Sequence, residues 1–259
     1  MNITTIYFSA TYTTKKIATI LTDEIARLLG CTATKKDITN LNDFSGTIPG
    51  EDDIVIAAMP VYAGRIPEKG AQALRSIKSN GNKAILVAVY GNREYDDALV
   101  EMQDIAEACN LNVIAAAAFI AQHSIFPKTA AGRPDASDIE AIKGFARECA
   151  QMVLSGKELS GINIKGNRPY KIPGSIPLKV KTNSRCTECG TCSKLCPAGA
   201  IPPDNPKITE HERCIHCGRC INICPRKARS FGGLLYAIAS YKFNKKNKAR
   251  REPEFFFAK

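Results

Sequence analysis

The feature that most constrains this chain is a cysteine pattern, C-x2-C-x2-C-x3-C-P, which occurs over residues 186–197 and again over residues 214–225. Eight of the eleven cysteines belong to these two copies. At this spacing three thiolates bind one iron–sulfur cluster, and the fourth, next to the proline, reaches the neighbouring cluster. The expected ligand sets are therefore Cys186, Cys189, Cys192 and Cys224 for cluster 1, and Cys214, Cys217, Cys220 and Cys196 for cluster 2.

Zinc sites and disulfides are the alternatives for so many cysteines. Zinc sites usually separate two C-x2-C pairs by a longer loop, whereas here three cysteines follow one another at x2 spacing and the whole unit is duplicated. The stretch over residues 184–230 closely resembles the symmetric bacterial two-cluster ferredoxins. This resemblance implies two [4Fe-4S] clusters, each a carrier of one electron.

Cysteines reserved for metal, together with the first residues of the chain, predict a protein of a reducing cytoplasm. Residues 1–8 lack the basic start and the apolar core of a secretory signal peptide, and are more typical of an opening β-strand. The sequence has no apolar run of about eighteen residues or more, so no membrane-spanning helix is expected. The oxygen sensitivity of exposed clusters would suit an anaerobe.

Apolar runs typical of β-strands alternate with longer helical patterns over the first 160 residues. The strands are expected at 3–8, 32–37, 54–58, 84–90 and 113–119, and the helices at 14–29, 67–80, 96–109 and 136–154. This alternation predicts an α/β fold with a doubly wound, five-stranded parallel sheet. In such folds the ligand lies beyond the carboxyl ends of the strands, where the winding direction reverses.

The loop between the first expected strand and helix is rich in hydroxyl groups. Its hydroxyl residues are Ser9, Thr11, Thr13 and Thr14. Hydroxyls and backbone N–H groups at a helix N-terminus form an anion site. Because the G-x-G-x-x-G motif of dinucleotide sites is absent, the loop favours a flavin monophosphate. Ordinary helix capping by Thr13 or Thr14 is the alternative interpretation.

Two further loops leave strands that neighbour the first strand in this topology. Each contains a glycine and an aromatic ring that could lie against a flavin, although simple packing of the ring is the alternative. The candidate cofactor-binding residues in these loops are Pro60, Val61, Tyr62, Ala63, Gly64, Tyr90, Gly91, Asn92, Arg93, Tyr95 and Asp96.

Over residues 1–155 the chain resembles flavodoxin. This resemblance implies FMN, with its phosphate held by the hydroxyl-rich loop, its ring stacked on Tyr62 and Tyr95, and the peptide at Gly64 near flavin N5. Tyr12 stands where flavodoxins commonly have glycine, and a tyrosine adopts a positive φ only at a cost. We therefore expect Tyr12 to narrow the phosphate loop, or to contact the ligand or the second domain.

The expected layout is a flavodoxin-like FMN-binding domain over 1–160, a linker over 161–183, a two-cluster ferredoxin domain over 184–230 and a basic tail over 231–259. Residues 161–259 contain 20 Lys and Arg against 6 Asp and Glu, which predicts an acidic redox partner protein. For the tail, a terminal helix that docks on its own protein is the preferred interpretation, and weak contact with a membrane surface is the alternative. No nucleic-acid-binding module accompanies the charge, so no nucleic-acid partner is expected.

The whole pattern resembles the flavodoxin–ferredoxin fusions of anaerobic bacteria and archaea. It predicts an electron-transfer flavoprotein in which two [4Fe-4S] clusters exchange electrons with FMN and with another redox protein. No NAD(P)H-binding motif is visible in the sequence. Two alternatives stay open: a ferredoxin whose flavodoxin-like half is an empty docking module, and a flavin-dependent reductase of a quinone-type small molecule.

Overall fold

The computed structural model describes residues 1–41, 49–174 and 176–259. Ser175, within the expected linker, lies outside the described residues. The first part of the chain alternates strands and helices: β1 (Ile3–Tyr7), α1 (Thr13–Leu29), β2 (Ala33–Asp37), β3 (Ile54–Pro60), α2 (Glu68–Arg75), β4 (Lys83–Tyr90), α3 (Ala98–Ala108), β5 (Asn112–Ile120) and α4 (Ala136–Leu154). Helix α2 ends five residues earlier than the sequence predicts. There the Ser76 hydroxyl donates to the Ala73 carbonyl at 2.7 Å and competes with the helical hydrogen bonds.

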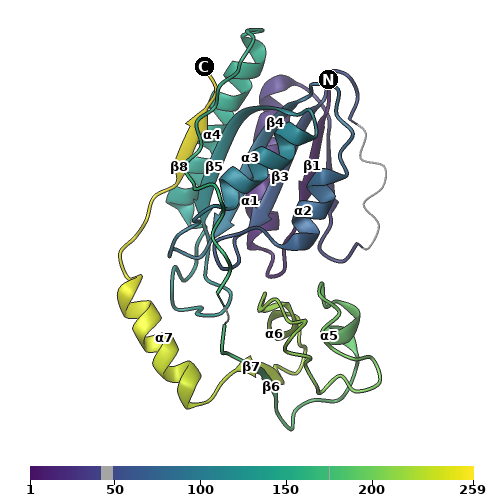
Figure 1. Cartoon of the computed structure of the whole chain (residues 1–259), viewed down its shortest axis with the longest axis vertical. Coiled ribbons are helices and arrows are strands. Elements are labelled where there is room, and N and C mark those ends of the chain that lie inside the picture. The colour runs from purple at the N-terminus through teal and green to yellow at the C-terminus, as the bar shows by residue number, and fades with distance from the viewer. Residues whose placement is uncertain (42–48, 175) are drawn as a thin grey trace.

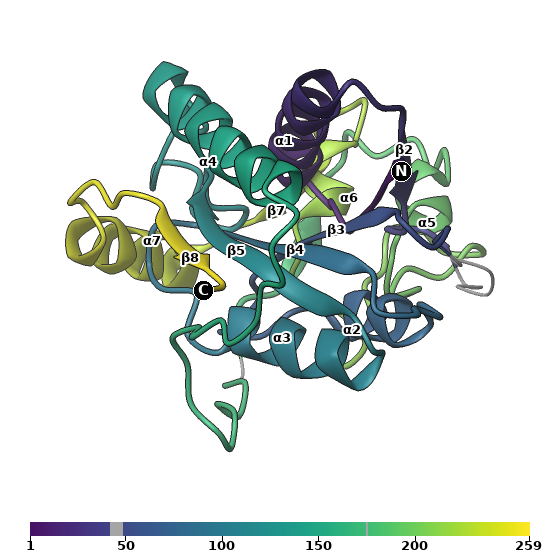
Figure 2. The ribbon, with the colours of Figure 1, turned by 90° about the horizontal axis from the view of Figure 1, so that it is seen from above.

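Strands β1 to β5 form a parallel sheet in the order β2-β1-β3-β4-β5, which is the flavodoxin-like order of doubly wound folds. Helices α1 and α4 cover one face of the sheet, and α2 and α3 cover the other (Figure 2). The expected five-stranded, doubly wound sheet is confirmed. Its winding reverses between β1 and β3, so the carboxyl ends of these strands open the crevice in which such folds bind ligands.

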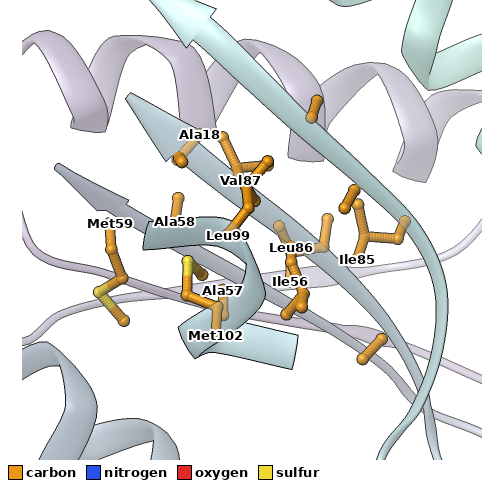
Figure 3. Close-up of a cluster of buried hydrophobic side chains, with 14 of the residues drawn as sticks. Ala18, Ile56, Ala57, Ala58, Met59, Ile85, Leu86, Val87, Leu99 and Met102 are labelled. Carbon is orange, nitrogen blue, oxygen red and sulfur yellow. The ribbon is translucent and has the colours of Figure 1, made fainter. Parts of the chain in front are cut away.

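The core of this domain lies on both faces of the central strands. Every residue of β3, and all but the first residue of β4 and β5, is buried, because helices cover both faces of a parallel sheet. Figure 3 shows Ile56 of β3 and Leu86 of β4 near Leu99 and Met102 of α3. This packing makes the sheet a rigid support for the loops at its carboxyl edge.

A sixth strand, β8 (Glu254–Phe257), pairs antiparallel with β5 at the edge of the sheet (Figure 1). Phe255 stacks on Phe145 of α4 with ring centroids 5.1 Å apart, and lies 5.8 Å from Phe119 of β5. The sequence predicts a basic tail over these residues, with a terminal helix that docks on its own protein, and no strand. The end of this tail instead covers the exposed edge of β5, where unpaired backbone groups would otherwise face solvent.

The first half of the expected linker packs against the sheet domain. Ile162 and Ile164 join its hydrophobic core. Asp97, just before α3, accepts hydrogen bonds from the backbone N–H groups of Asn167 and Lys171 at 2.8 and 2.6 Å. The segment therefore lies extended along α3, because one carboxylate satisfies two of its backbone donors.

The second part of the chain lies beyond the carboxyl ends of the sheet strands (Figure 1). It contains the antiparallel pair β6 (Val180–Thr182) and β7 (Arg229–Phe231), and the short helices α5 (Thr191–Lys194) and α6 (Arg219–Asn222). Helix α7 (Leu234–Lys246) follows and leads back to β8. Within the described ranges, no helix is both long and apolar enough to cross a membrane.

The duplicated sequence also has a duplicated backbone conformation, at a spacing of 28 residues. Glu188 and His216 both have a φ of 54°, and Gly190 and Gly218, which immediately precede α5 and α6, have φ values of 72° and 76°. Left-handed residues at equivalent positions curl both segments in the same way. The two cysteine segments are therefore two copies of one loop.

Candidate functional site

Each expected set of four cysteines lines a cavity of its own. The first cavity is lined by Cys186, Cys189, Cys192 and Cys224. The second cavity is lined by Cys196, Cys214, Cys217 and Cys220. The structure thus brings the eight cysteines together in two groups, and each group takes its fourth member from the other repeat.

The surroundings of these thiols suit thiolates that bind a cluster. The backbone N–H of Ala200 donates to Cys196 Sγ at 3.3 Å, and the N–H of Ala228 donates to Cys224 Sγ at 3.2 Å. Hydrogen bonds of this kind to sulfur are among the features that tune iron–sulfur clusters. Burial raises the pKa of Cys217 to about 12, so this thiol must release a proton when it binds a metal.

The donor set indicates which metal group fits. In the described parts of the chain, no three or more His, Cys, Asp or Glu side chains are placed to hold a metal ion between them. Four thiols around a cavity suit instead a cluster of several iron atoms. An all-cysteine donor set also selects iron–sulfur clusters and other soft centres over hard cations.

The two cysteine cavities differ in their access to solvent. Cys189, at the first cavity, is exposed, whereas Cys217, at the second, is buried and belongs to the hydrophobic core of the sheet domain. The exposed Arg226 lines the first cavity, and Lys207 pairs with Glu188 beside it. A cluster in the first cavity would therefore lie near a basic surface, and one in the second would lie against the sheet domain.

A third and larger cavity, of about 360 Å³, lies between the sheet domain and the cysteine loops. The loops after β1, β3, β4 and β5 line one side of it, and Ile215, His216 and Phe243 line the other. Ten candidate cofactor-binding residues from the sequence analysis line this cavity: Thr11, Thr13, Thr14, Pro60, Val61, Tyr62, Ala63, Tyr90, Gly91 and Arg93.

Six further candidates are not among the residues that line the cavity: Ser9, Tyr12, Gly64, Asn92, Tyr95 and Asp96. Tyr95 cannot stack on a ligand there, because its ring is fully buried beside Tyr90 and its hydroxyl donates to Glu254 of β8 at 2.8 Å. Of the two tyrosines expected to stack on the flavin, Tyr62 lines the cavity and Tyr95 does not. Burial raises the pKa of Tyr62 well above its usual value, so its hydroxyl stays neutral.

Three of these residues shape the loops around the cavity. Ser9 Oγ accepts a hydrogen bond from the Lys15 N–H at 3.0 Å. Asp96 pairs with Arg93, which does line the cavity. A Cβ at Gly64 would come within 2.5 Å of the Asp96 carboxylate, so glycine is needed for the two loops to approach each other.

The start of α1 lines this cavity and has the groups that an anion site needs. The lining residues Thr13 and Thr14 open this helix, and Tyr12 before them supplies no side-chain cap. A helix N-terminus with hydroxyls favours a bound phosphate. Tyr12 adopts a φ of 68°, where glycine would be less strained. Its ring is 45% exposed and lies 5.6 Å from the Arg219 guanidinium, so Tyr12 contacts the second domain, one of the outcomes expected for it.

Arg219 joins the cysteine domain to this same loop. Its Nη1 donates to the carbonyls of Ser9 and Ala10 at 3.1 and 3.2 Å, and the side chain is buried. A Cβ at the neighbouring Gly218 would lie 3.2 Å from the Ser124 carbonyl, so the two domains meet backbone to backbone. The loop that carries the cluster 2 cysteines is therefore docked directly on the hydroxyl-rich loop.

The loop after β5 supplies lining residues that the sequence analysis does not assign to a cofactor. His123 Nδ1 accepts hydrogen bonds from the N–H groups of Ile125 and Phe126 at 3.1 and 3.2 Å, which leaves Nε2 to carry the proton. Burial, together with the charge of Arg93, lowers the pKa of His123 to about 4. Phe243 of α7 packs edge-on against this ring at 4.7 Å. Of His123 and Phe243, His123 carries a local signal, because it lies in the loop that follows the strand predicted over 113–119.

The tail holds α7 against these loops. The Tyr236 hydroxyl donates to the Ile125 carbonyl at 2.9 Å, and Asn92 Nδ2 donates to the carbonyls of Asn247 and Ala249 at 3.0 and 2.8 Å. Asn92, a candidate for cofactor binding, therefore binds the tail. Because β8 anchors the end of the tail in the sheet, the cysteine domain is tied to the sheet domain on both sides.

Comparisons with known proteins give matches in both parts of the chain. Residues 185–229 match the family described as the 4Fe-4S dicluster domain. Flavodoxin 2 from Bacillus cereus is 14% identical, covers 59% of this chain and 99% of its own, and has a TM-score of 0.45. The flavodoxin of Streptococcus pneumonia TIGR4 is 22% identical over 59% and 99%, with a TM-score of 0.42. No curated protein matches the chain. The chain thus joins a flavodoxin-like α/β fold, evident from its strand order, to a 4Fe-4S dicluster domain.

Proposed function

We propose that this protein passes electrons between two [4Fe-4S] clusters and FMN, and exchanges them with a second redox protein. The observation that carries the proposal is the cavity that both domains share. Ile215 and His216, from the loop of the cluster 2 cysteines, line the same cavity as Thr13 at the start of α1. A flavin in this cavity and a cluster in the second cysteine cavity would be separated by little more than one loop.

The cavity suits FMN in size and in chemistry. Its volume of about 360 Å³ falls within the range of small-molecule sites, roughly 300–1,000 Å³. Hydroxyls at the N-terminus of α1 suit the phosphate, and the half-buried Tyr62 suits the ring. FMN supplies chemistry of one or two electrons, and each cluster supplies chemistry of one electron.

The two cysteine cavities suggest an order for the relay. Cluster 2 would lie next to the flavin, and cluster 1 would lie at the surface, where Cys189 is exposed. Exposed cations, among them Arg185 and Arg226, lie close in sequence to the cluster 1 ligands. A partner with an acidic surface would complement them, and opposite charges speed the encounter of redox proteins.

The alternative of a small-molecule reductase is less well supported. Ile215 and Phe243, which packs on His123, line the cavity opposite the loops of the sheet domain. A second substrate would have to fit beside the flavin in a cavity of about 360 Å³. An electron carrier needs no such space, because electrons would reach the flavin through cluster 2.

Iron and FMN per chain, measured on protein purified without oxygen, test the proposal. We expect about eight iron and one FMN, since two [4Fe-4S] clusters contain eight iron. Thr13→Val should weaken FMN binding about tenfold, because a hydrogen bond to a charged group contributes about 1.5–3 kcal/mol. Thr34→Val, on the exposed edge strand β2, is the matched control and should bind FMN like the unmodified chain.

The opposite results would be informative as well. Full iron without FMN, even in excess flavin, would refute the relay and leave a ferredoxin with a docking domain. Equal weakening of FMN binding in Thr13→Val and Thr34→Val would mean that the flavin does not use the N-terminus of α1. Turnover with a quinone-type acceptor would favour the reductase.

A further inference from the structure

The two cysteine repeats differ at a buried position beside the cluster cavities. At the 28-residue spacing, Ile201 in the first repeat corresponds to Arg229 in the second. Both side chains are 3% exposed. Ile201 lines the cavity of cluster 2, and Arg229 lines the cavity of cluster 1. Equivalent places beside the two clusters thus hold an apolar side chain and a cation.

The contacts of Arg229 leave its charge without a protein counter-charge. Its Nη1 donates to Cys192 Sγ at 3.6 Å and to the Pro206 carbonyl at 3.3 Å. Its Nη2 donates to the Ile208 carbonyl at 3.1 Å and to Thr209 Oγ1 at 2.7 Å. No Asp or Glu in the described part of the chain is among these acceptors. Because an unpaired buried cation is costly, the negative charge of a cluster at Cys192 is the partner that would offset this cost.

We propose that Arg229 raises the reduction potential of cluster 1 above that of cluster 2. Reduction adds one negative charge to a cluster, and a fixed cation beside a ligand sulfur favours the more negative form. The hydrogen bond to Cys192 Sγ acts in the same direction. This inference rests on the two-cluster part of the proposed function and does not depend on FMN.

Cluster 2 also lies near cations, but they act on it less directly. The charge of Arg229 also acts on Cys214 and Cys220 of cluster 2, but its hydrogen bond to a ligand sulfur goes to Cys192 of cluster 1. Lys69 of α2 interacts with Cys196 from a partly exposed position, where water screens its charge. Arg219 is buried but directs its guanidinium to carbonyls of the sheet domain.

The placement of Arg229 gives the relay a direction. An electron that enters a chain with both clusters oxidised settles on the cluster of higher potential, here cluster 1. That cluster carries the exposed Cys189, so the electron rests at the surface that faces a partner. An electron that reaches cluster 2 would then move to lower energy by passing on to cluster 1.

A redox titration of the full chain without oxygen tests this inference. The contact-shifted NMR signals of the Cys β-protons show the oxidation state of each cluster separately, because each signal belongs to a ligand of one cluster. In Arg229→Gln we expect the equilibrium constant for reducing cluster 1 to fall about tenfold, which is about 59 mV for one electron, with a smaller fall at cluster 2. Arg229→Lys keeps the charge and should retain most of the difference between the clusters.

Two further variants make the test specific. Lys69→Gln removes a cation near cluster 2, so it should lower the reduction potential of cluster 2 more than that of cluster 1. The difference between the two reduction potentials should therefore widen. Arg213→Gln removes an exposed cation of the same domain and should leave the difference unchanged. If Arg229→Gln fails to retain iron, the reduction potentials of the two clusters in the unmodified chain, in Arg229→Lys and in Lys69→Gln still test whether cluster 1 has the higher potential.

Equal potentials in the unmodified chain, or a higher potential at cluster 2, would overturn the inference. A fall of the same size at both clusters in Arg229→Gln would overturn it too. Iron content keeps the two proposals apart: a chain without iron contradicts the proposed function, whereas full iron with equal potentials contradicts only the role of Arg229.

Discussion

Replacing Arg219 with glutamine should loosen the docking of the cysteine domain on the sheet domain. The buried guanidinium donates to the carbonyls of Ser9 and Ala10, in the loop that precedes α1. Glutamine is shorter and uncharged, so it cannot keep both contacts. Neither cysteine cavity loses a ligand in this variant, so full iron content is expected.

The magnitude follows from these contacts. A hydrogen bond to a charged group contributes about 1.5–3 kcal/mol, and Arg219 makes two. Burial of the charge and the lack of a partner for Nε within the described residues offset part of this gain. We expect a net loss of about 2 kcal/mol, which is about a 30-fold shift toward the undocked state at 1.4 kcal/mol per factor of ten.

Amide hydrogen exchange measures this opening segment by segment. In Arg219→Gln, the amides of residues 9–14 and 214–220 should exchange about 30-fold faster, because a loss of about 2 kcal/mol in docking free energy makes the undocked state about 30-fold more populated. The amides of β3 and β4 should keep their protection. Arg213→Gln is the matched control, because it removes an exposed arginine of the same domain that pairs with nearby Glu210. Unchanged exchange in both segments would refute the role of Arg219, and faster exchange throughout the chain would indicate general destabilisation instead.

Three further predictions concern the edge of the sheet, the cavity and α7. Phe255→Ala should lower the unfolding free energy of the sheet domain by about 2 kcal/mol in chemical denaturation, because its ring stacks on Phe145; unchanged stability would mean that β8 adds little. Because the folded-state pKa of His123 is lowered to about 4, the unfolded chain takes up a proton that the folded chain does not. The contribution of His123 to the unfolding free energy should therefore be complete above about pH 6.5 and fall by up to about 3 kcal/mol toward pH 4. The variant His123→Gln should lose this part of the pH dependence. If the unfolding free energy of both proteins falls equally with pH, His123 is not the group responsible. We also propose that α7, with its exposed apolar first turn and the lysines of its last turn, contacts anionic membrane surfaces. The full chain should sediment with anionic but not neutral vesicles, and Leu235→Ser should bind about tenfold more weakly; binding unaffected by Leu235→Ser would exclude this contact.

The parts of the molecule that the sequence predicts are those with local signals. The cysteine spacing determines which thiols lie near one another, and the apolar runs of β3 to β5 mark buried strands because both faces of a parallel sheet are covered. The hydroxyls of Thr13 and Thr14 are recognisable because they sit between a strand and a helix. In each case the neighbours that matter lie within a few residues along the chain.

The parts that sequence reasoning does not predict depend on distant segments. Tyr95 is buried because β8, far away in the sequence, covers this edge of the sheet, and Glu254 of β8 accepts a hydrogen bond from the Tyr95 hydroxyl. Asn92 binds the tail for the same reason. Phe243 reaches the cavity because α7 packs on the loop after β5 and β8 anchors the end of the tail in the sheet. No local pattern indicates which distant segment pairs with β5.

The central claim is that flavin and clusters in one chain exchange electrons directly. Photoreduction of FMN in the iron-loaded full chain without oxygen, followed by bleaching of the cluster absorbance, tests it. We expect the clusters to be reduced at a rate that does not change when the protein is diluted, because one loop separates the cavity from cluster 2. A rate that falls in proportion to protein concentration, or clusters that stay oxidised, would contradict an intramolecular relay.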